Sequence, residues 1–209
     1  DGANALQIAL QAPNQGVDLI RLLRANTKTP DTLTLAARVG DVETILALIE
    51  AGANVDLPGK GGQSPLEVAA AAGQTAAVRA LLTGGADPGF ESDTGISPLE
   101  VAAAKGHVET AAILIKHGGI TDAQKASALY RANQSGSAEM ARVLLEEGAD
   151  ALGDAGQALT PLDYTFQYGS DSLVNVYLER GHELNVATAA RLGRVEELTT
   201  LLSSGSNPR

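Results

Sequence analysis

The stretch Ser64-Pro65-Leu66-Glu67-Val68-Ala69-Ala70 decides the fold of this chain, because the same residue types return thirty-three positions later as Ser97-Pro98-Leu99-Glu100-Val101-Ala102-Ala103. A glycine follows each copy at the same distance, and a second glycine lies twelve residues further on. These glycines are Gly73 with Gly85 in the first copy and Gly106 with Gly118 in the second. A constant period of this length indicates a repeat protein.

The twelve-residue glycine spacing recurs along the chain. Its other occurrences are Gly40 with Gly52, Gly136 with Gly148, Gly169 with Gly181, and Gly193 with Gly205. Within each pair, apolar residues lie five, eight and nine positions after the first glycine, which places them on one face of a helix. The six sets are Ile45, Leu48, Ile49; Val78, Leu81, Leu82; Ala111, Leu114, Ile115; Ala141, Leu144, Leu145; Val174, Tyr177, Leu178; and Leu198, Leu201, Leu202. One such stripe cannot be buried inside its own repeat, so neighbouring repeats are expected to stack.

The repeating unit resembles the ankyrin repeat. It has the thirty-three-residue period, a Ser/Thr-Pro-Leu opening, an Ala-Ala pair and a closing Gly-Ala-Asp or Gly-Ala-Asn. The resemblance runs from about Asp31 to Gly205 and is strongest over residues 31–119. It implies an all-α fold, an ankyrin-repeat solenoid of stacked antiparallel helix pairs with short β-hairpin loops. For function it implies protein binding, without indicating which protein is bound.

We expect one continuous ankyrin-repeat domain over residues 1–209. The expected parts are a degenerate N-terminal cap at 1–29, repeats at 30–62, 63–95, 96–125, 126–158 and 159–185, and a C-terminal cap at 186–209. Gly106 and Gly136 are thirty residues apart instead of thirty-three, so the hairpin around Ile120 to Ala126 is expected to be truncated.

The charge of the chain restricts its partners. Twenty-five acidic residues against fifteen basic ones give a net charge of −10. This charge argues against nucleic acid or an anionic membrane surface as the main partner, and favours a folded protein that is basic or of mixed charge. No apolar run approaches the ~20 residues that cross a bilayer, so a soluble chain is expected, monomeric by itself.

The compartment stays open at this stage. The chain has no cysteine, so it can form no disulfide or thiolate metal site and would tolerate oxidising or reducing surroundings. It begins at Asp1 without a methionine, which fits either removal of a signal peptide or a chain shortened at its beginning. The first origin would place it in the periplasm or outside the cell, whereas a cytoplasmic location is the alternative.

No residue pattern indicates catalysis, a metal or a cofactor. His107, His117 and His182 lie at recurrent structural positions, and no two histidines have a metal-ligand spacing. Residues 58–62 are interpreted as a glycine-rich hairpin tip and not as a phosphate-binding loop. The rival hypothesis is an active site in the concave groove with Glu100 and Asp163 as acid and base. Both residues belong to the opening motif, where hydrogen bonding between repeats is the simpler role, so we expect no enzyme.

The resemblance also implies where a partner would bind. In the family, the variable surface consists of the hairpin tips and the two residues after the Ala-Ala pair, which line the concave face. The candidates on that surface are Arg38, Lys60, Phe90, Asp93, Thr94, Lys105, Gln134, Gln167, Tyr168 and Arg191. Interface energy concentrates in aromatic and arginine side chains, so Tyr168 and Phe90 are expected to be the hydrophobic anchors. Tyr164 and Tyr177 replace core Val or Leu of other repeats and are expected to fill space.

Two roles follow for such a protein. It can cover a partner, for instance an enzyme, and so inhibit or sequester it, or it can act as a scaffold or adaptor that holds two partners. We favour covering, because a binding surface with no catalytic or signalling domain attached in these residues acts most simply in that way.

Overall fold

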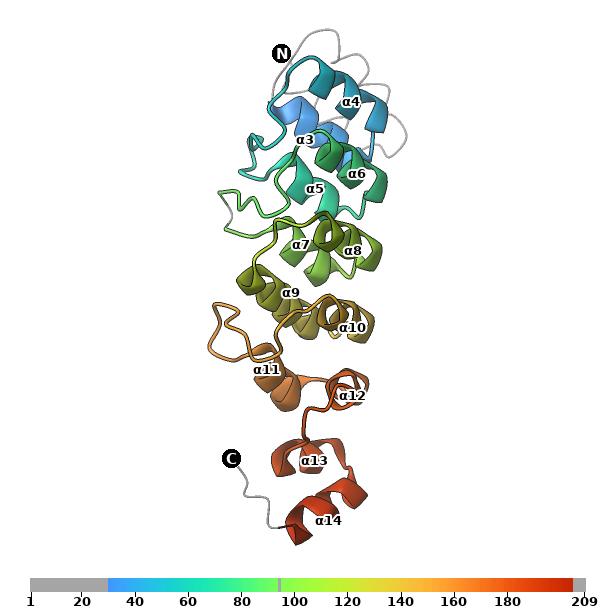
Figure 1. Ribbon diagram of the computed structural model, residues 1–209, viewed down its shortest axis with the longest axis vertical. Coiled ribbons are helices and arrows are strands. Elements are labelled where there is room, and N and C mark those ends of the chain that lie inside the picture. Colours follow the sequence, from blue (N-terminus) through green and yellow to red (C-terminus); the bar gives the residue numbers. More distant parts are fainter. Residues whose placement is uncertain (1–29, 94, 205–209) are drawn as a thin grey trace. The chain divides into compact units, whose positions relative to one another are not determined.

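The structure, a computed structural model, describes residues 30–93 and 95–204 of the chain. The expected N-terminal cap at 1–29 lies outside the described residues. Over those ranges the chain forms twelve helices, α3 to α14, and no strand (Figure 1). The all-α prediction is therefore confirmed.

The first compact unit ends at Thr121, and the part of it that the structure describes contains three helix pairs. They are α3 (Pro30–Val39) with α4 (Val42–Glu50), α5 (Pro65–Ala71) with α6 (Thr75–Thr83), and α7 (Pro98–Lys105) with α8 (Val108–His117). The first helices of the pairs pack on one another, α3 on α5 and α5 on α7. The second helices do the same, α4 on α6 and α6 on α8, so each pair covers the next (Figure 1).

The second unit begins at Asp122 and repeats this arrangement. Its helices are α9 (Asp122–Gln134), α10 (Ala138–Glu146), α11 (Pro161–Tyr168), α12 (Asp171–Leu178), α13 (Val186–Leu192) and α14 (Val195–Ser203). Here α9 packs on α11 and α10 packs on α12, while α13 and α14 form the closing pair expected near the C-terminal end. That all these repeats form one continuous domain stays a prediction.

The Ser/Thr-Pro motif starts three of the first helices, α5, α7 and α11. The hydroxyl groups of Ser64, Ser97 and Thr160 accept the backbone N–H three residues ahead, and the following proline needs no N–H partner at a helix start. At the other end Gly106 adopts φ 75°, a left-handed conformation that favours glycine, and it caps α7. These two signals explain why the sequence predicts the helix pairs so well.

Helix α9 differs from the prediction. The connection before α9 is truncated, as expected, because α8 ends at His117 and α9 begins at Asp122. The hairpin predicted around Ile120–Ala126 is nevertheless wrong from Asp122 onward, where the chain is already in this 13-residue helix. Nothing in its sequence breaks a helix, since it has neither proline nor glycine, and Lys125 forms an ion pair with Asp122 at 3.6 Å.

The core consists of thin layers between neighbouring helix pairs. The Ala-Ala pairs at 69–70 and 102–103 are fully buried, as are Val78 and Leu81 of the stripe on α6. In α14 the predicted stripe is not buried, because Leu202 remains 60% exposed and no residue of this helix counts as buried. Helix α14 ends the described stack, so only α13 covers it closely.

Backbone N–H groups of the loops donate to carboxylates elsewhere in the stack. Asp31 accepts the N–H of Lys60 at 2.7 Å, and Asp56 accepts the N–H of Asp87 at 3.0 Å. The tip of the loop before α5 is closed by a bond of 3.0 Å from Gly59 N–H to the carbonyl of Gln63, without a regular strand. Turns and these cross-links therefore hold the loops, where the resemblance implies β-hairpins.

Asp56 has an unusual pKa for an exposed loop. Partial burial raises the pKa of its carboxyl above the ordinary value, the hydrogen bond from Asp87 N–H opposes this, and the negative charge of Asp87 adds to the increase. The charged form of Asp56 is thus disfavoured in the folded chain.

Replacing Leu114 by alanine tests the stacking register. Leu114 is fully buried in α8, so Leu114→Ala should lower the free energy of unfolding by about 2–5 kcal/mol, measured by chemical denaturation. Leu46→Ala, at a leucine of α4 that is 44% exposed, is the matched control and should cost less than about 1 kcal/mol. Equal losses in the two variants would contradict the register.

Replacing Asp56 by asparagine tests the pKa. A carboxyl with a raised pKa binds its proton more tightly in the folded state, so the stability of the parent falls as the pH rises through the window above the ordinary Asp value. Asp56→Asn keeps an acceptor for the N–H of Asp87 and removes the charge. We expect it to unfold at a higher denaturant concentration than the parent at neutral pH, and the gain to shrink as the pH falls through that window. Asp93→Asn, at the next loop tip, is the charge-matched control.

Candidate protein-binding surfaces

In the first unit, two of the candidate residues lie around one small cavity. This cavity of about 130 Å³ is lined by Asp31, Thr34, Leu35, Arg38, Gly59, Lys60 and Gly61. The Lys60 side chain is 81% exposed, and its Nζ lies 3.3 Å from the Asp31 carboxylate. The Asp31 side chain is only 16% exposed, so the Lys60 ammonium is the charge of this pair that a partner can reach.

The other candidates of the first unit are spread over its loops and the end of α7. Asp93 is exposed, and its N–H donates to the carbonyl of Gly62 at 3.2 Å. Lys105 is exposed in the last turn of α7. Phe90, expected to be an exposed anchor, is only partly exposed, which leaves less of its ring for a partner. Thr94 lies outside the described residues.

In the second unit, three tyrosines form a row that ends at the surface. Tyr168 is 59% exposed at the end of α11, and its ring centroid lies 5.2 Å from that of Tyr164. Tyr164 in turn contacts the buried Tyr130 of α9 edge to face, with centroids 5.0 Å apart. The four-residue spacing of Tyr164 and Tyr168 on one helix could have revealed half of this row. The row supports the Tyr168 ring from behind, so the ring is held at the surface.

Gln134 and Gln167 flank this part of the second unit. Both side chains are exposed, at the ends of α9 and α11. Gln134 accepts a hydrogen bond of 3.4 Å from Arg131. Their amides provide donors and acceptors on the same ends of the first helices as Tyr168.

A buried polar pair fixes the helices under the tyrosine row. Tyr177 fills the core of α12, as expected, and its hydroxyl accepts a hydrogen bond of 2.6 Å from Asn133 of α9. Asn133 also donates to the carbonyl of Pro161 at the start of α11, at 2.9 Å. Burial raises the pKa of Tyr177 to about 12, although the bond from Asn133 works in the opposite direction. Helices α9, α11 and α12 are therefore held together by one side-chain amide.

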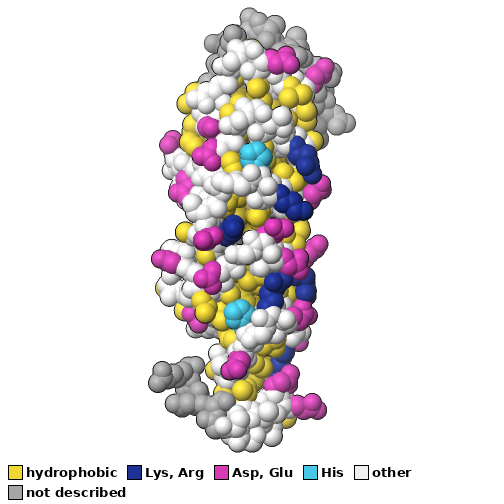
Figure 2. All heavy atoms as spheres, in the orientation of Figure 1, with side chains coloured by type: hydrophobic (Ala, Val, Ile, Leu, Met, Phe, Trp, Pro, Cys, Tyr) yellow, Lys and Arg dark blue, Asp and Glu magenta, His cyan; other side chains and the backbone are white. Residues whose placement is uncertain are grey.

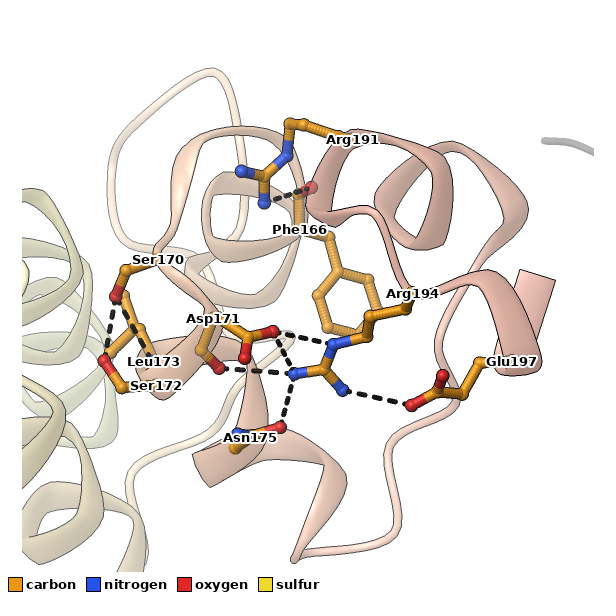
Figure 3. Close-up of polar contacts among 9 residues, drawn as sticks. All are labelled: Phe166, Ser170, Asp171, Ser172, Leu173, Asn175, Arg191, Arg194 and Glu197. Carbon is orange, nitrogen blue, oxygen red and sulfur yellow. Dashed lines mark hydrogen bonds and ion pairs between the residues drawn. The ribbon is translucent and has the colours of Figure 1, made fainter.

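Arg191 lies on the closing helix pair, where a second arginine provides most of the contacts (Figure 3). Arg191 is exposed and makes one bond of 3.3 Å to the carbonyl of Phe166. Arg194, whose side chain is only 13% exposed, donates through Nε to Asp171 at 2.7 Å and through Nη2 to Asn175 at 2.5 Å. Arg194 thus attaches α14 to α12, whereas the Arg191 guanidinium is available for a partner.

The carboxylates of the opening motif have structural partners. Glu67 is buried and accepts hydrogen bonds from Gln63, at 2.9 Å, and from Ser92 in the following loop. Glu100 completes a capping box with Ser97, and Asp163 accepts a bond of 2.7 Å from Thr160. Each of these acids therefore serves a helix start or a link between loops.

The histidines also have local structural roles. The Nε2 of His107 lies 3.2 Å from the carbonyl of Ala71 in the preceding repeat, and the His182 ring lies 5.8 Å from the Tyr177 ring. Within residues 30–93 and 95–204, no three His, Cys, Asp or Glu side chains are grouped so that they could hold a metal ion.

The second helices carry a groove that was not predicted from the sequence. A cavity of about 490 Å³ lies between α6 and α8, lined by Arg79, Leu82, Thr83, Glu109, Ala112, Ile113, Lys116 and His117. Figure 2 shows basic side chains over α6 and α8. No single residue of this groove differs from an ordinary helix surface, which is why the sequence alone gave no signal.

The comparison with known families agrees with this architecture. The family description "Ankyrin repeats (3 copies)" matches residues 6–92 and, again, residues 66–155. The chain belongs to the ankyrin repeat family. Ankyrin repeats are protein–protein interaction modules, so this chain is a protein-binding repeat protein. No curated protein matches it in sequence. Among the helices described, none is long and apolar enough to cross a membrane.

Replacing Arg194 by glutamine tests its role in this ankyrin chain. Arg194→Gln removes charge-assisted bonds to a part-buried guanidinium, so opening of α13 and α14 should become easier by about 1–3 kcal/mol. Hydrogen exchange followed by mass spectrometry would show faster exchange there and no change in α9 to α12. Arg191→Gln is the control, with an expected effect of less than about 0.5 kcal/mol. Equal exchange in the two variants would contradict this assignment.

Proposed function

We propose that this ankyrin chain binds a partner protein and, by covering it, inhibits or sequesters it. The observation that carries the proposal is the exposed ring of Tyr168, supported by Tyr164 and Tyr130. A large apolar side chain that is mostly in water and yet held in place has the properties of an interface anchor. The Tyr168 side chain loses little conformational entropy on binding, because the neighbouring rings already restrict its motion.

Each unit has its own proposed partner contacts, on its loops and first helices. Arg38 and Lys60 in the first unit, and Gln167 and Arg191 in the second, supply polar and charged groups. Phe90 contributes the part of its ring that remains exposed. Since the chain carries a net charge of −10, the partner is basic or of mixed charge, and its association slows as salt is added. The chain acts as a monomer until it meets this partner.

Catalysis is not part of the proposed function. The two acids of the rival hypothesis, Glu100 and Asp163, accept hydrogen bonds within their own helix starts. A general acid or base needs a free lone pair or proton directed at a substrate. A helix-start role accounts for both residues without a reaction.

A scaffold or adaptor role is the second candidate. The groove between α6 and α8 favours it, because that groove lies on second helices, whereas the proposed anchors lie on loops and first helices. A protein with two surfaces can hold two partners at once. The stoichiometry of the purified complex distinguishes the roles, since one partner per chain supports covering and two bound together support scaffolding.

Replacing Tyr168 by alanine tests the main proposal. The partner is captured from the native source with the parent chain, and its affinity is then measured with each variant. Tyr168→Ala should weaken binding by about 2 kcal/mol or more, which is roughly thirtyfold, while circular dichroism remains helical. Val195→Ala, at an exposed apolar residue of α14, is the matched control and should bind like the parent. Unchanged affinity of Tyr168→Ala would contradict the role of Tyr168 as the anchor and would point to the second helices as the contact surface.

A further inference from the structure

We propose that the groove between α6 and α8 is a second binding surface, which takes an acidic segment of a partner protein through Arg79 and Lys116. The groove has an apolar floor of Leu82, Ala112 and Ile113, and the two basic side chains are exposed at its walls. The equivalent positions in the second unit carry an ion pair instead of two cations.

The second helices of the repeats share one register. Helices α6, α8, α10 and α12 each begin two residues after the first glycine of their repeat. Position six after that glycine is Arg79 in α6 and Arg142 in α10. In the repeat that follows each of these arginines, position ten after the first glycine is Lys116, which corresponds to Arg79, and Glu179, which corresponds to Arg142. The pairs Arg79–Lys116 and Arg142–Glu179 therefore occupy corresponding places.

In the second unit this place holds an ion pair. Arg142 donates to Glu179 at 2.5 Å, and Arg180 reaches Glu146 at 3.2 Å beside it. The same contact raises the pKa of the Arg142 guanidinium and lowers the pKa of the Glu179 carboxyl. The geometry of neighbouring second helices thus brings positions six and ten within reach of each other.

In the first unit the same place holds two positive charges. Lys116 stands where the counter-ion of Arg79 would be, and neither side chain has an ion-pair partner within the described part of the chain. Glu109 and His117 also line the groove, but neither forms an ion pair with Arg79 or Lys116. Two like charges facing one groove repel each other, and an anion between them removes that cost.

The apolar floor decides the kind of anion. A simple ion needs only charge and donors, whereas Leu82, Ala112 and Ile113 offer surface to apolar side chains. The cavity of about 490 Å³ has room for several side chains. The occupant that matches both features is a peptide segment in which Asp or Glu alternates with apolar residues. The net charge of −10 repels such a segment elsewhere, so its binding depends on the local cations.

The test uses the full chain and a synthetic peptide with blocked ends in which Glu and Leu alternate. Fluorescence anisotropy measures its affinity for the parent and for two variants. Arg79→Gln removes one cation, and Lys116→Glu supplies the internal counter-ion found in the second unit. Each should weaken binding at least about tenfold, because a charge-assisted contact is lost. Lys125→Glu makes the same change in net charge on α9 and should leave the affinity within about threefold of the parent.

Controls on the probe identify the ligand. A peptide with Gln in place of Glu should bind at least about tenfold more weakly. The affinity of the acidic peptide should also fall as salt is added, and inorganic phosphate should not displace the peptide. Circular dichroism checks that each variant is folded, which is expected because Arg79 and Lys116 are exposed.

Several outcomes would overturn the proposal. These are no binding to the parent at a peptide concentration of about 1 mM, an affinity of Arg79→Gln or Lys116→Glu equal to that of the parent, or a loss in Lys125→Glu as large as in Lys116→Glu. Displacement of the peptide by phosphate would show a simple anion site. None of these measurements involves Tyr168, so failure here leaves the covering role open, and failure of Tyr168→Ala leaves this groove open.

Discussion

The apolar stripe of each helix pair stays in water unless a neighbouring pair covers it, and the rest of the structure depends on that burial. Small residues make it effective, because the Ala-Ala pairs at 69–70 and 102–103 let the first helices approach closely. Where the stack ends, at α14, the burial ends too, and Leu202 remains in water. The exposed side chains of the loops and of the outer helix faces take no part in this packing, so they can serve recognition.

Polar groups in these repeats mainly connect one repeat to the next. Glu67 takes the place where the family usually has a bridging histidine, and it links the loops by accepting from Gln63 and Ser92. Asp56 makes a similar link at the cost of a disfavoured charge. In the second unit Asn133 connects α9 to α12 in the core, and Arg194 connects the last helix pair to α12. Recognition residues such as Tyr168 are therefore carried on helices that side-chain bonds have already fixed.

The sequence predicted the helix pairs well, because capping residues and glycines act locally and recur at a constant spacing. At α9 the shorter glycine spacing correctly indicated a shorter loop, but the start of the helix was missed, because residues 122–126 favour a helix and carry no Ser-Pro opening to mark it. Leu202 shows that an apolar stripe stays exposed where no neighbouring helix covers it. The tyrosine row and the groove of Arg79 and Lys116 depend on pairs of residues from different repeats. Such pairs become visible only when the register between repeats is known.

The links between repeats also bear on how quickly the chain finds its structure. The bond from Asn133 to Tyr177 joins residues 44 positions apart, and the bonds from Lys60 to Asp31 and from Asp87 to Asp56 span 29 and 31 positions. Contacts over such short chain distances require little loop closure, which favours fast folding that spreads from one repeat to the next. The Ser-Pro-Leu repeats around α5 and α7, with complete caps and buried alanines, are the natural nucleus. Folding from that nucleus would reach α13 and α14 last, and these helices would be the first to open.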